Sequence, residues 1–431
     1  MSELETRPGD DTDEVRAVAR LLTDATGAVT ATTRAVHRAV ADRAWPSPGG
    51  PAKAVHDAIS SLVYTSIDTG TTVAGAIADQ GLRITGATRR LRPWSGSRTG
   101  RNLAGFLNGA FGDRLLTRHP LLATPMRIRV DGRDVPATPG RLAAAFPDAT
   151  SYVVVFLHGL IETEEWWGPA GENFGSRLAA DVGCTPVLLR YNTGRHISDN
   201  GRELADLVGA LVDGWPVDVE RIAIVGHSMG GLVARSAVHQ ADGEPWLDLV
   251  RHVVCLGTPH DGSPVERGAN LVAWALRGIG ETAPLGALLD TRSAGIKDLR
   301  HGYLDERDWV GIDPDELLTD RRAKAYRTAP RARQSFAAAS LGAPGSRTGR
   351  WVGDLLVLPD SALSPRLRAR RRWFGRMHHF RLLRDGRVYR QLRRWLDDQD
   401  RLGEGPPGEV QPLPTQNSFP SGSQSTDQRV P

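Results

Sequence analysis

Apolar residues in the first part of the chain recur with the period of a helix. The seam positions follow alternating steps of three and four residues: Val15, Val18, Leu22, Ala25, Val29, Thr32, Val36 and Ala39. Such steps place side chains on one helix face, and the Pro- and Gly-rich stretch at 45–50 ends the pattern. Further helical patterns follow at 53–67 and 72–82. We therefore expect a helical region over residues 13–125, preceded by a disordered polar segment at residues 1–12.

The Ala-rich seam of this N-terminal region has to be covered by other apolar surface. We expect its helices to form a hairpin or a small bundle that packs on the rest of the chain or pairs with a second copy, giving a homo-oligomer. A dedicated module that binds a partner or a lipid is the alternative interpretation.

From residue 126 onward the pattern changes to short apolar strands separated by helices. Met126–Val130 alternates as a half-buried strand does, and Asp131-Gly132 supplies a hairpin turn. Buried strands are predicted at Tyr152–Leu157, Thr185–Arg190, Ile222–Val225, Val253–Leu256 and Gln334–Ala339, with helices at Leu204–Val212 and Gly231–Ala237. This alternation predicts an α/β domain over residues 126–402, a mostly parallel sheet covered by helices on both faces. Residues 403–431, rich in Gly, Pro, Gln and Ser, are expected to be a disordered tail.

Composition narrows the choice of partners and compartment. Lys and Arg total 54 against 50 for Asp and Glu, and no basic stretch is interleaved with stacking aromatic residues, so nucleic acid is not expected as a partner. The acidic N-terminus lacks the features of a secretory signal, and no apolar run approaches the ~18 residues of a membrane span. We expect a cytoplasmic protein, with peripheral membrane contact left open. Cys184 and Cys255 lie among apolar residues and are expected to be buried thiols; neither a metal nor another cofactor is predicted.

The most informative motif is a Gly-x-Ser-x-Gly at Gly226–Gly230. A predicted buried strand runs directly into it and a predicted helix follows, which is the context of a nucleophile elbow. Such a turn strains the serine backbone and leaves no room for side chains two residues before and after it, where Gly226 and Gly230 stand. We therefore predict Ser228 as a nucleophile. A purely structural turn is the competing interpretation, which the flanking strand and helix disfavour.

This stretch resembles the elbow of bacterial lipases and esterases of the α/β-hydrolase superfamily. Val153–Leu160 resembles the family's strand and His-Gly turn, which implies that the backbone N–H groups of Leu160 and Met229 form an oxyanion hole, with His158 as a structural residue. Leu256–Ser263 resembles the segment after the next strand in lipases and in enzymes similar to GPI inositol-deacylases. Its His260 and Asp261 come too early in the chain for the family's catalytic order, so we assign them to loop structure or pocket lining.

The family's acid lies in a turn after the next-to-last strand. Val352–Val357, followed by a Ser-Ala pair at 361–362, resembles that turn. The resemblance implies Asp354 as the acid, with Asp360 as the reserve candidate. An ordinary turn aspartate is the alternative interpretation of Asp354.

The family's base lies beyond the last strand. Met377–Leu383 resembles the catalytic-His loop, in which the histidine directly precedes a Phe and a Leu-Leu pair follows. The resemblance therefore implies His379, with the adjacent His378 as its rival. The resulting chain order, Ser228, Asp354 and His379, is the order that the fold requires.

This triad implies hydrolysis of a small-molecule or lipid carboxylic ester through an acyl-enzyme on Ser228. Acyl transfer to an alcohol would use the same three residues, and a non-catalytic scaffold kept for binding is the third hypothesis.

The sequence departs from the family pattern in two places. Residues 264–333 form a long insertion with an amphipathic run at Leu271–Ile279, which implies a helical cap or lid, or else a surface excursion. Arg366–Arg376 is unusually basic, which is typical of a solvated loop; its alternative is contact with anionic lipid headgroups.

Overall fold

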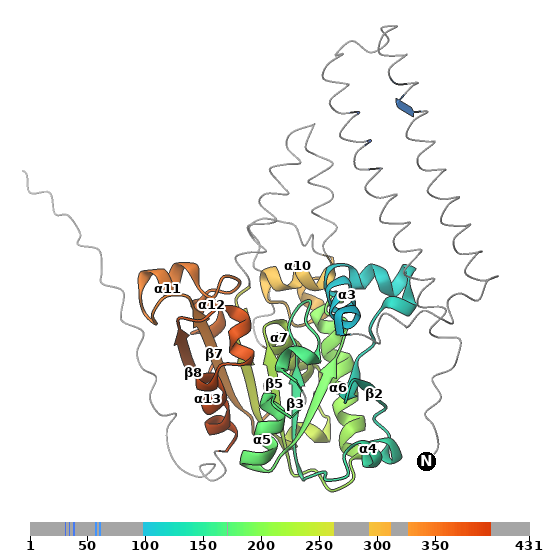
Figure 1. Ribbon diagram of the computed structural model, residues 1–431, viewed down its shortest axis with the longest axis vertical. Helices are drawn as coiled ribbons and strands as arrows, with labels where there is room; N and C mark the ends of the chain where they lie inside the picture. The colour runs from blue at the N-terminus through green and yellow to red at the C-terminus, as the bar shows by residue number, and fades with distance from the viewer. Residues whose placement is uncertain are drawn as a thin grey trace, which may run out of the picture.

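The computed structural model describes residues 98–169, 171–262, 293–311 and 326–397, together with isolated positions between 31 and 61. These residues are built around one eight-stranded sheet in the order β2-β1-β4-β3-β5-β6-β7-β8 (Figure 1). Six neighbouring strands, from β4 to β8, run parallel, and the β1–β2 hairpin adds to β4 in the antiparallel sense. The strands are β1 Arg127–Val130, β2 Arg133–Val135, β3 Tyr152–Leu157, β4 Thr185–Arg190, β5 Arg221–His227, β6 Val250–Leu256, β7 Arg333–Ser340 and β8 Arg370–Gly375.

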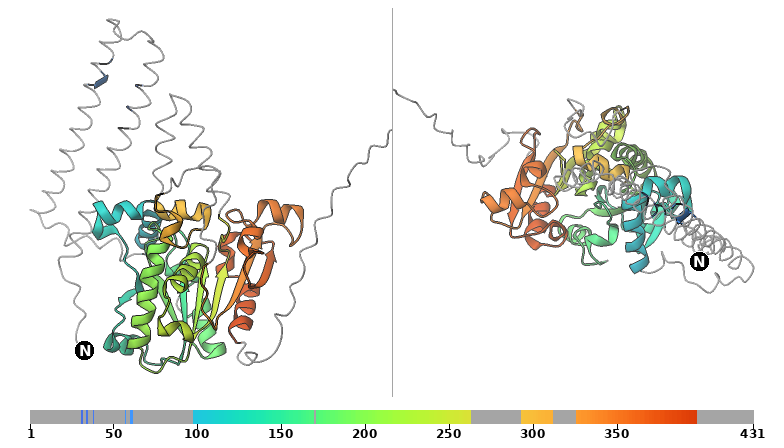
Figure 2. Two further views of the ribbon diagram at one scale, coloured as in Figure 1. Left: turned by 180° about the vertical axis from the view of Figure 1, so that it is seen from behind. Right: turned by 90° about the horizontal axis from the view of Figure 1, so that it is seen from above.

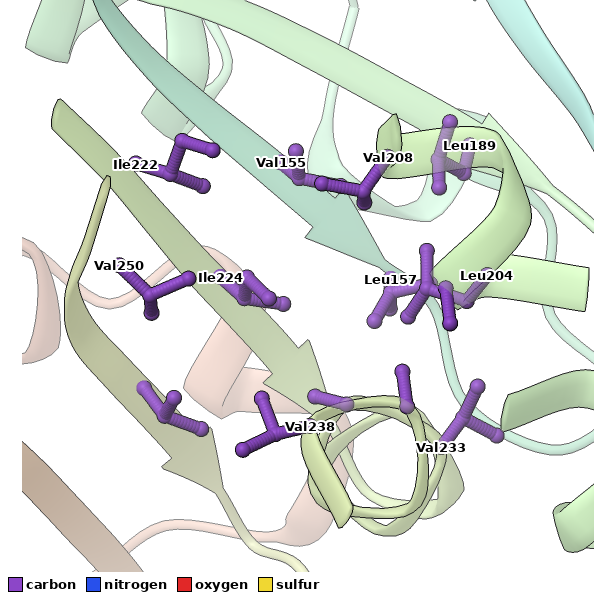
Figure 3. Close-up of a cluster of buried hydrophobic side chains, with 14 of the residues drawn as sticks. Val155, Leu157, Leu189, Leu204, Val208, Ile222, Ile224, Val233, Val238 and Val250 are labelled. Carbon is purple, nitrogen blue, oxygen red and sulfur yellow. The ribbon is translucent and has the colours of Figure 1, made fainter. Parts of the chain in front are cut away.

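Helices cover both faces of this sheet because alternate strand residues are apolar on both sides. Val155 and Leu157 of β3 pack with Ile222 and Ile224 of β5 against the two longest covering helices, as Figure 3 shows. Their neighbours, such as Val154 and Phe156, face a second apolar cluster on the opposite side. The first cluster is covered by α4 Pro139–Ala145, α6 Ile197–Gly214 and α7 Met229–Gln240, and the second by α5 Phe174–Val182 and α13 Gly386–Leu396.

Shorter elements complete the described chain. They are α3 Arg98–Arg118, α10 Ala294–His301, α11 Arg347–Val352 and α12 Pro359–Leu363, with 3₁₀ turns at Pro120–Leu122, Glu164–Trp167, Pro245–Leu249, Glu306–Asp308 and His379–Leu383. Helix α3 is held against the sheet's loops because its Gly109 carbonyl accepts a hydrogen bond from Ser293 Oγ at 2.6 Å and its Gly112 carbonyl accepts one from Asn192 Nδ2 at 2.9 Å. In the described part of the chain, no helix is long and apolar enough to span a bilayer.

The α/β-hydrolase fold expected from the sequence is confirmed, with β3 and β4 at the predicted residues. The Asp131-Gly132 turn is also present, and both residues have positive φ, 50° and 77°, as a tight hairpin requires. Strands β5, β6 and β7 extend beyond their predicted cores because polar residues at their ends also pair in the sheet. Cys184 and Cys255 are buried free thiols.

The expectation that Arg366–Arg376 is a solvated loop is wrong for its second half. Residues Arg370–Gly375 form β8, which pairs in parallel with β7 from Ser335 to Ser340. The strand escaped prediction because it lies at the sheet edge and places only Trp373 and Phe374 against apolar clusters, one on each face. An edge strand tolerates such a polar sequence.

Several sequence-based expectations fall outside the described residues. They include the seam at 15–39 with its proposed homo-oligomer, the amphipathic run at Leu271–Ile279 and the tail at 403–431. Of the predicted insertion at 264–333, the described part contains α10 and the 3₁₀ turn at Glu306–Asp308.

A buried ion cluster fastens the β1–β2 hairpin to the loop after β3. Glu164 accepts hydrogen bonds from Arg129 Nε of β1 at 3.0 Å and from Arg190 Nε and Nη2 of β4 at 2.6 Å each. All three side chains are largely buried. Burial, the largest influence, raises the pKa of Glu164, but the two arginines outweigh it and hold the pKa below its ordinary value.

Replacing Glu164 by Ala should lower the free energy of unfolding by about 3 kcal/mol, because buried Arg190 loses its carboxylate and buried Arg129 keeps only its pair with Asp134 within the described residues. Because the pKa of Glu164 is lowered in the folded state, the ion cluster contributes its full stability above the unfolded pKa of about 4.3. This stability is lost as the pH falls below that value. Urea unfolding at pH 7 and near pH 4 should therefore show a large gap from the wild type at pH 7 and a smaller one in acid. Glu220→Ala, whose carboxylate accepts an exposed hydrogen bond from Ser151, serves as the control. Equal losses in the two variants would contradict the prediction.

Candidate active site

The predicted nucleophile lies in a strained turn between β5 and α7. Ser228 has φ 52° and ψ −122°, a conformation that non-glycine residues rarely adopt. Its backbone N–H donates to the Leu256 carbonyl oxygen at the end of β6, at 2.8 Å. The serine therefore sits at the carboxyl ends of the parallel strands, where ligands bind in α/β sheets.

The glycines around Ser228 allow the backbone segments to approach one another. A Cβ on Gly226 would lie 2.4 Å from the Gly230 carbonyl carbon, and one on Gly230 would lie 2.6 Å from the His158 carbonyl oxygen. A Cβ on Gly231 would lie 2.0 Å from Thr258 Oγ1. The elbow therefore excludes side chains at all three glycines, through its contacts with its own helix, with the loop after β3 and with the loop after β6.

The predicted base and acid are in direct contact. His379 Nδ1 donates to Asp354 Oδ2 at 2.7 Å, and the His379 backbone N–H donates to the Asp354 carbonyl at 3.1 Å. Both side chains are buried. The second carboxylate oxygen, Asp354 Oδ1, accepts the backbone N–H groups of Leu356 at 3.0 Å and Val357 at 2.8 Å, which fixes the carboxylate plane.

The rival residues lie elsewhere. His378 is exposed and precedes the 3₁₀ turn that begins at His379, and Asp360 is exposed in the first turn of α12. The structure therefore brings together His379 and Asp354 and leaves the other two side chains outside the buried pair.

His379 lies against the segments that surround the serine. Its ring is 4.7 Å from the ring of His227, centroid to centroid, and His227 directly precedes Ser228. Gly257 follows Leu256, whose carbonyl oxygen accepts the Ser228 N–H. A Cβ added to Gly257 would lie 3.1 Å from His379 Cε1. Ser228 and the His379–Asp354 pair thus lie at the same edge of the sheet, where β5, β6, β7 and β8 end.

The loop proposed to hold the oxyanion passes beside Ser228. A Cβ on Gly159 would lie 3.0 Å from Ser228 Cβ, so this turn packs directly on the serine. Leu160 follows in the turn, and Met229 is the first residue of α7. Within the described residues, the backbone N–H groups of these two residues have no hydrogen-bond partner.

His158 supports the turn rather than facing the serine. Tyr191 donates its phenol O–H to the His158 carbonyl oxygen at 2.6 Å and its backbone N–H to His158 Nε2 at 3.3 Å. The two rings also stack at 4.4 Å. Burial lowers the pKa of His158, so its imidazole is neutral and can accept the Tyr191 N–H.

Glu162 is a site residue that the sequence analysis missed. Its buried carboxylate accepts the Gly159 N–H at 2.6 Å and bonds with His227 Nδ1 at 3.0 Å. Burial, the largest influence, raises the pKa of Glu162, but the interactions with His227 and with the Gly159 N–H outweigh it and lower the pKa. A carboxylate three residues after the His-Gly turn was the available signal, although sequence alone does not reveal that it points inward.

The early pair His260 and Asp261 belongs to the loop after β6. His260 is buried, its Nδ1 lies 2.9 Å from Arg235 Nη1, and its ring packs on Phe336 at 4.1 Å. The Asp261 N–H donates to Ser361 Oγ at 3.1 Å. These contacts connect the loop after β6 with α7, β7 and α12.

Known proteins with similar sequences point to one family. A family described as "PGAP1-like alpha/beta domain" matches residues 192–275, which include the elbow and the loop after β6. A triacylglycerol lipase from Burkholderia plantarii is 29% identical over 219 residues, which are 50% of this chain and 56% of the lipase. The chain is similar to lipases of the α/β-hydrolase type over about half of its length.

The lipase resemblance found in the sequence is thereby confirmed, and the chain spans about half the length of the curated lipase that it matches. Among solved structures, the mature lipase BlEst2 from Bacillus licheniformis has 21% identity and a TM-score of 0.40, with coverage of 63% of this chain and 98% of that one. EstA from Clostridium botulinum has 12% identity and a TM-score of 0.33, with coverage of 58% and 88%.

The crowding at the elbow predicts a severe effect of a single added methyl group. Gly230→Ala should lower the free energy of unfolding by about 2 kcal/mol or more, because the new Cβ meets backbone atoms that cannot rotate away. Gly140→Ala in α4, where no atom lies within 4 Å of the added Cβ, should be neutral or slightly stabilising. Thermal unfolding of both variants checks this, and similar melting temperatures would refute the packing argument.

Proposed function

We propose that this chain hydrolyses carboxylic esters through an acyl-enzyme on Ser228. The observation that carries the proposal is the buried His379–Asp354 hydrogen bond of 2.7 Å at the strand ends where the strained Ser228 lies. A serine hydroxyl is a weak nucleophile at neutral pH unless a base accepts its proton, and this pair supplies an oriented base. Small-molecule or lipid esters are the proposed substrates, as the match to a triacylglycerol lipase suggests.

Each residue has a defined task in the proposed reaction. Since His379 Nδ1 is bonded to Asp354, its Nε2 is the atom that accepts the Ser228 proton while Oγ attacks the ester carbonyl. The tetrahedral intermediate collapses when the C–O bond to the alcohol breaks and the alcohol takes the proton from Nε2. Water then attacks the acyl-enzyme in the same way, which releases the acid and restores Ser228. Asp354 stabilises the imidazolium in both steps.

The developing oxyanion would be stabilised by the N–H groups of Leu160 and Met229. Each donor of this kind is typically worth about 10²–10³ in rate. The N-terminal end of α7, which begins at Met229, also favours negative charge.

Glu162 is proposed as a positioning residue for this machinery. By accepting the Gly159 N–H it holds the turn that carries Leu160, and by bonding His227 it ties that turn to the residue before the nucleophile. Its charge also acts on His379. One buried carboxylate thus serves both the oxyanion loop and the base.

Labelling with a fluorophosphonate probe tests the nucleophile directly. The folded wild-type chain should be labelled, Ser228→Ala should not, and His379→Ala should react about 10²–10⁴-fold more slowly because its base is gone. His378→Ala, a neighbouring imidazole outside the buried pair, should label at the wild-type rate. An unlabelled wild-type chain with native circular dichroism would refute the serine-hydrolase proposal, and would favour a binding scaffold.

The pH dependence of ester hydrolysis tests the electrostatics of the base. Burial is the largest influence on His379 and lowers its pKa, but the Asp354 charge and hydrogen bond together with the Glu162 charge raise the pKa above 6.5. Since only neutral imidazole accepts the serine proton, kcat/KM should fall as the pH drops through this raised pKa. Glu162→Gln should shift the acid limb to lower pH, because one of the raising charges is removed.

Glu220→Gln, which removes the same charge just before the start of β5, is the control and should leave the acid limb in place. A Glu162→Gln profile that superimposes on the wild type after scaling would show that Glu162 acts through structure alone.

A further inference from the structure

Four large apolar side chains are exposed together beside the candidate active site. They come from the end of β7, from α11 and from the turn that holds Asp354: Leu341 is 42% exposed, Trp351 82%, Val352 42% and Leu355 56%. The Leu341 N–H donates to the Gly353 carbonyl at 2.8 Å, which joins the first of them to the segment that carries the others. We call these four residues the apolar rim.

The apolar rim is held in place by an unusual backbone conformation. Leu355 has φ 85°, in the region that favours glycine, although its side chain is more than half exposed. A leucine in this region is strained, and the surrounding structure has to offset the strain. An outlier of this kind is a reason to look for a function of the segment.

A cleft of about 540 Å³ adjoins the rim and is surrounded by arginines. Five of the residues that line it are Arg372, Arg376, Arg387, Arg390 and Arg394, and no acidic residue of the described chain lines it. We call this feature the arginine cleft. Arg387 is paired with Asp385, and the other four positive charges repel one another unless an anion lies between them.

Secondary structure explains why these arginines converge. Residues 387, 390, 391 and 394 of α13 lie on one helix face, and residues 372 and 374 lie on one side of β8. Phe374 packs into the cluster under α13, so Arg372 emerges on the same side of the sheet as the helix. Arg376 follows the strand and lines the same cleft.

Among the arginines of the cleft, Arg387 holds two elements of the fold together, whereas the other four are not used in this way. Arg387 bonds to Asp385 and to the Gly375 carbonyl, which fastens α13 to β8. Arg372, Arg376, Arg390 and Arg394 are exposed and form no ion pair within the described part of the chain.

The rim and the cleft form one surface. The segment 341–344 begins in the rim and ends in the cleft wall at Ala343 and Pro344. The Arg376 N–H donates to the Gly342 carbonyl at 3.3 Å, so the cleft is tied to the same loop. Figure 2 shows β7, β8, α11 and α13 together at one end of the molecule, with α3 at the other.

We propose that this surface docks on an anionic phospholipid bilayer. Guanidinium groups bind phosphate oxygens in pairs and would hold the headgroups. Trp351 and its apolar neighbours would enter the interface, where tryptophan is favoured because its ring is apolar and its N–H is polar. Free phosphate would satisfy the arginines but would leave the rim exposed, which favours the bilayer as the occupant.

Docking of this kind would bring the candidate active site to the membrane. The rim is continuous with the Asp354 turn, and the cleft is continuous with the strand that leads to His379. Membrane-borne esters would then meet Ser228 without leaving the interface. This consequence rests on the proposed function, whereas the docking itself does not.

Binding of the full chain to vesicles tests the cleft. The chain should co-sediment with vesicles that contain phosphatidylglycerol and not with pure phosphatidylcholine vesicles, and added salt should weaken the binding. Each arginine near an anionic surface contributes about fivefold, so Arg372→Gln/Arg390→Gln should bind about 25-fold more weakly. The control variant Arg133→Gln/Arg141→Gln removes the same number of positive charges, one from β2 and one from α4, at the opposite edge of the sheet. It should bind the vesicles like the wild type.

A second pair of variants tests the rim. Trp351→Ser should reduce binding on the order of tenfold, because the interface loses its largest apolar contact. Leu121→Ser, which removes an exposed apolar side chain just after α3, should have no effect. Ser228→Ala should bind vesicles like the wild type, so loss of catalysis and loss of docking are distinguishable.

Three results would overturn the proposal. They are equal binding to both kinds of vesicle, equal losses in the cleft variant and its control, and calorimetric binding of inorganic phosphate without any binding to phosphatidylglycerol vesicles.

Discussion

The close approach of three backbone segments at the Ser228 elbow is the constraint on which the site depends. Gly226 meets Gly230, Gly230 meets the His158 carbonyl, and Gly159 meets the serine Cβ. Because these contacts leave no space for a methyl group, the elbow, the loop after β3 and the first turn of α7 are packed as one unit. Glu162 and Tyr191 then secure the same loop from its buried side. The strain at Ser228 is maintained by this packing and not by the local sequence alone.

Much of the fold followed from the sequence because its central strands are buried on both faces. Continuous apolar runs such as Tyr152–Leu157 mark such strands, and β3 spans the same residues. The edge strand β8 lacked this signal, since only one of its sides has a neighbouring strand and its first three residues are arginines. An arginine-rich segment can form a strand at the edge of a sheet. Its pattern of polar and apolar residues does not distinguish such a strand from a loop.

The site was predictable to a different degree for each residue. Ser228 was predictable from a local motif, because the sequence pattern indicates both the strand before it and the helix after it. Asp354 and His379 rested on resemblance, because their separation of 25 positions says nothing about the contact that folding creates. Glu162 had no motif at all. Its role depends on an inward orientation that arises only when the loop after β3 closes over His227.

Strand β8 has a second consequence, for the behaviour of the chain in concentrated solution. It ends the sheet, so its outer backbone N–H and C=O groups face no further strand within the described fold. An open edge of this kind can pair with an edge from another molecule and start aggregation. The arginine side chains along β8 place like charges where two such edges would meet. A row of positive charge therefore protects the sheet from growing beyond its own chain.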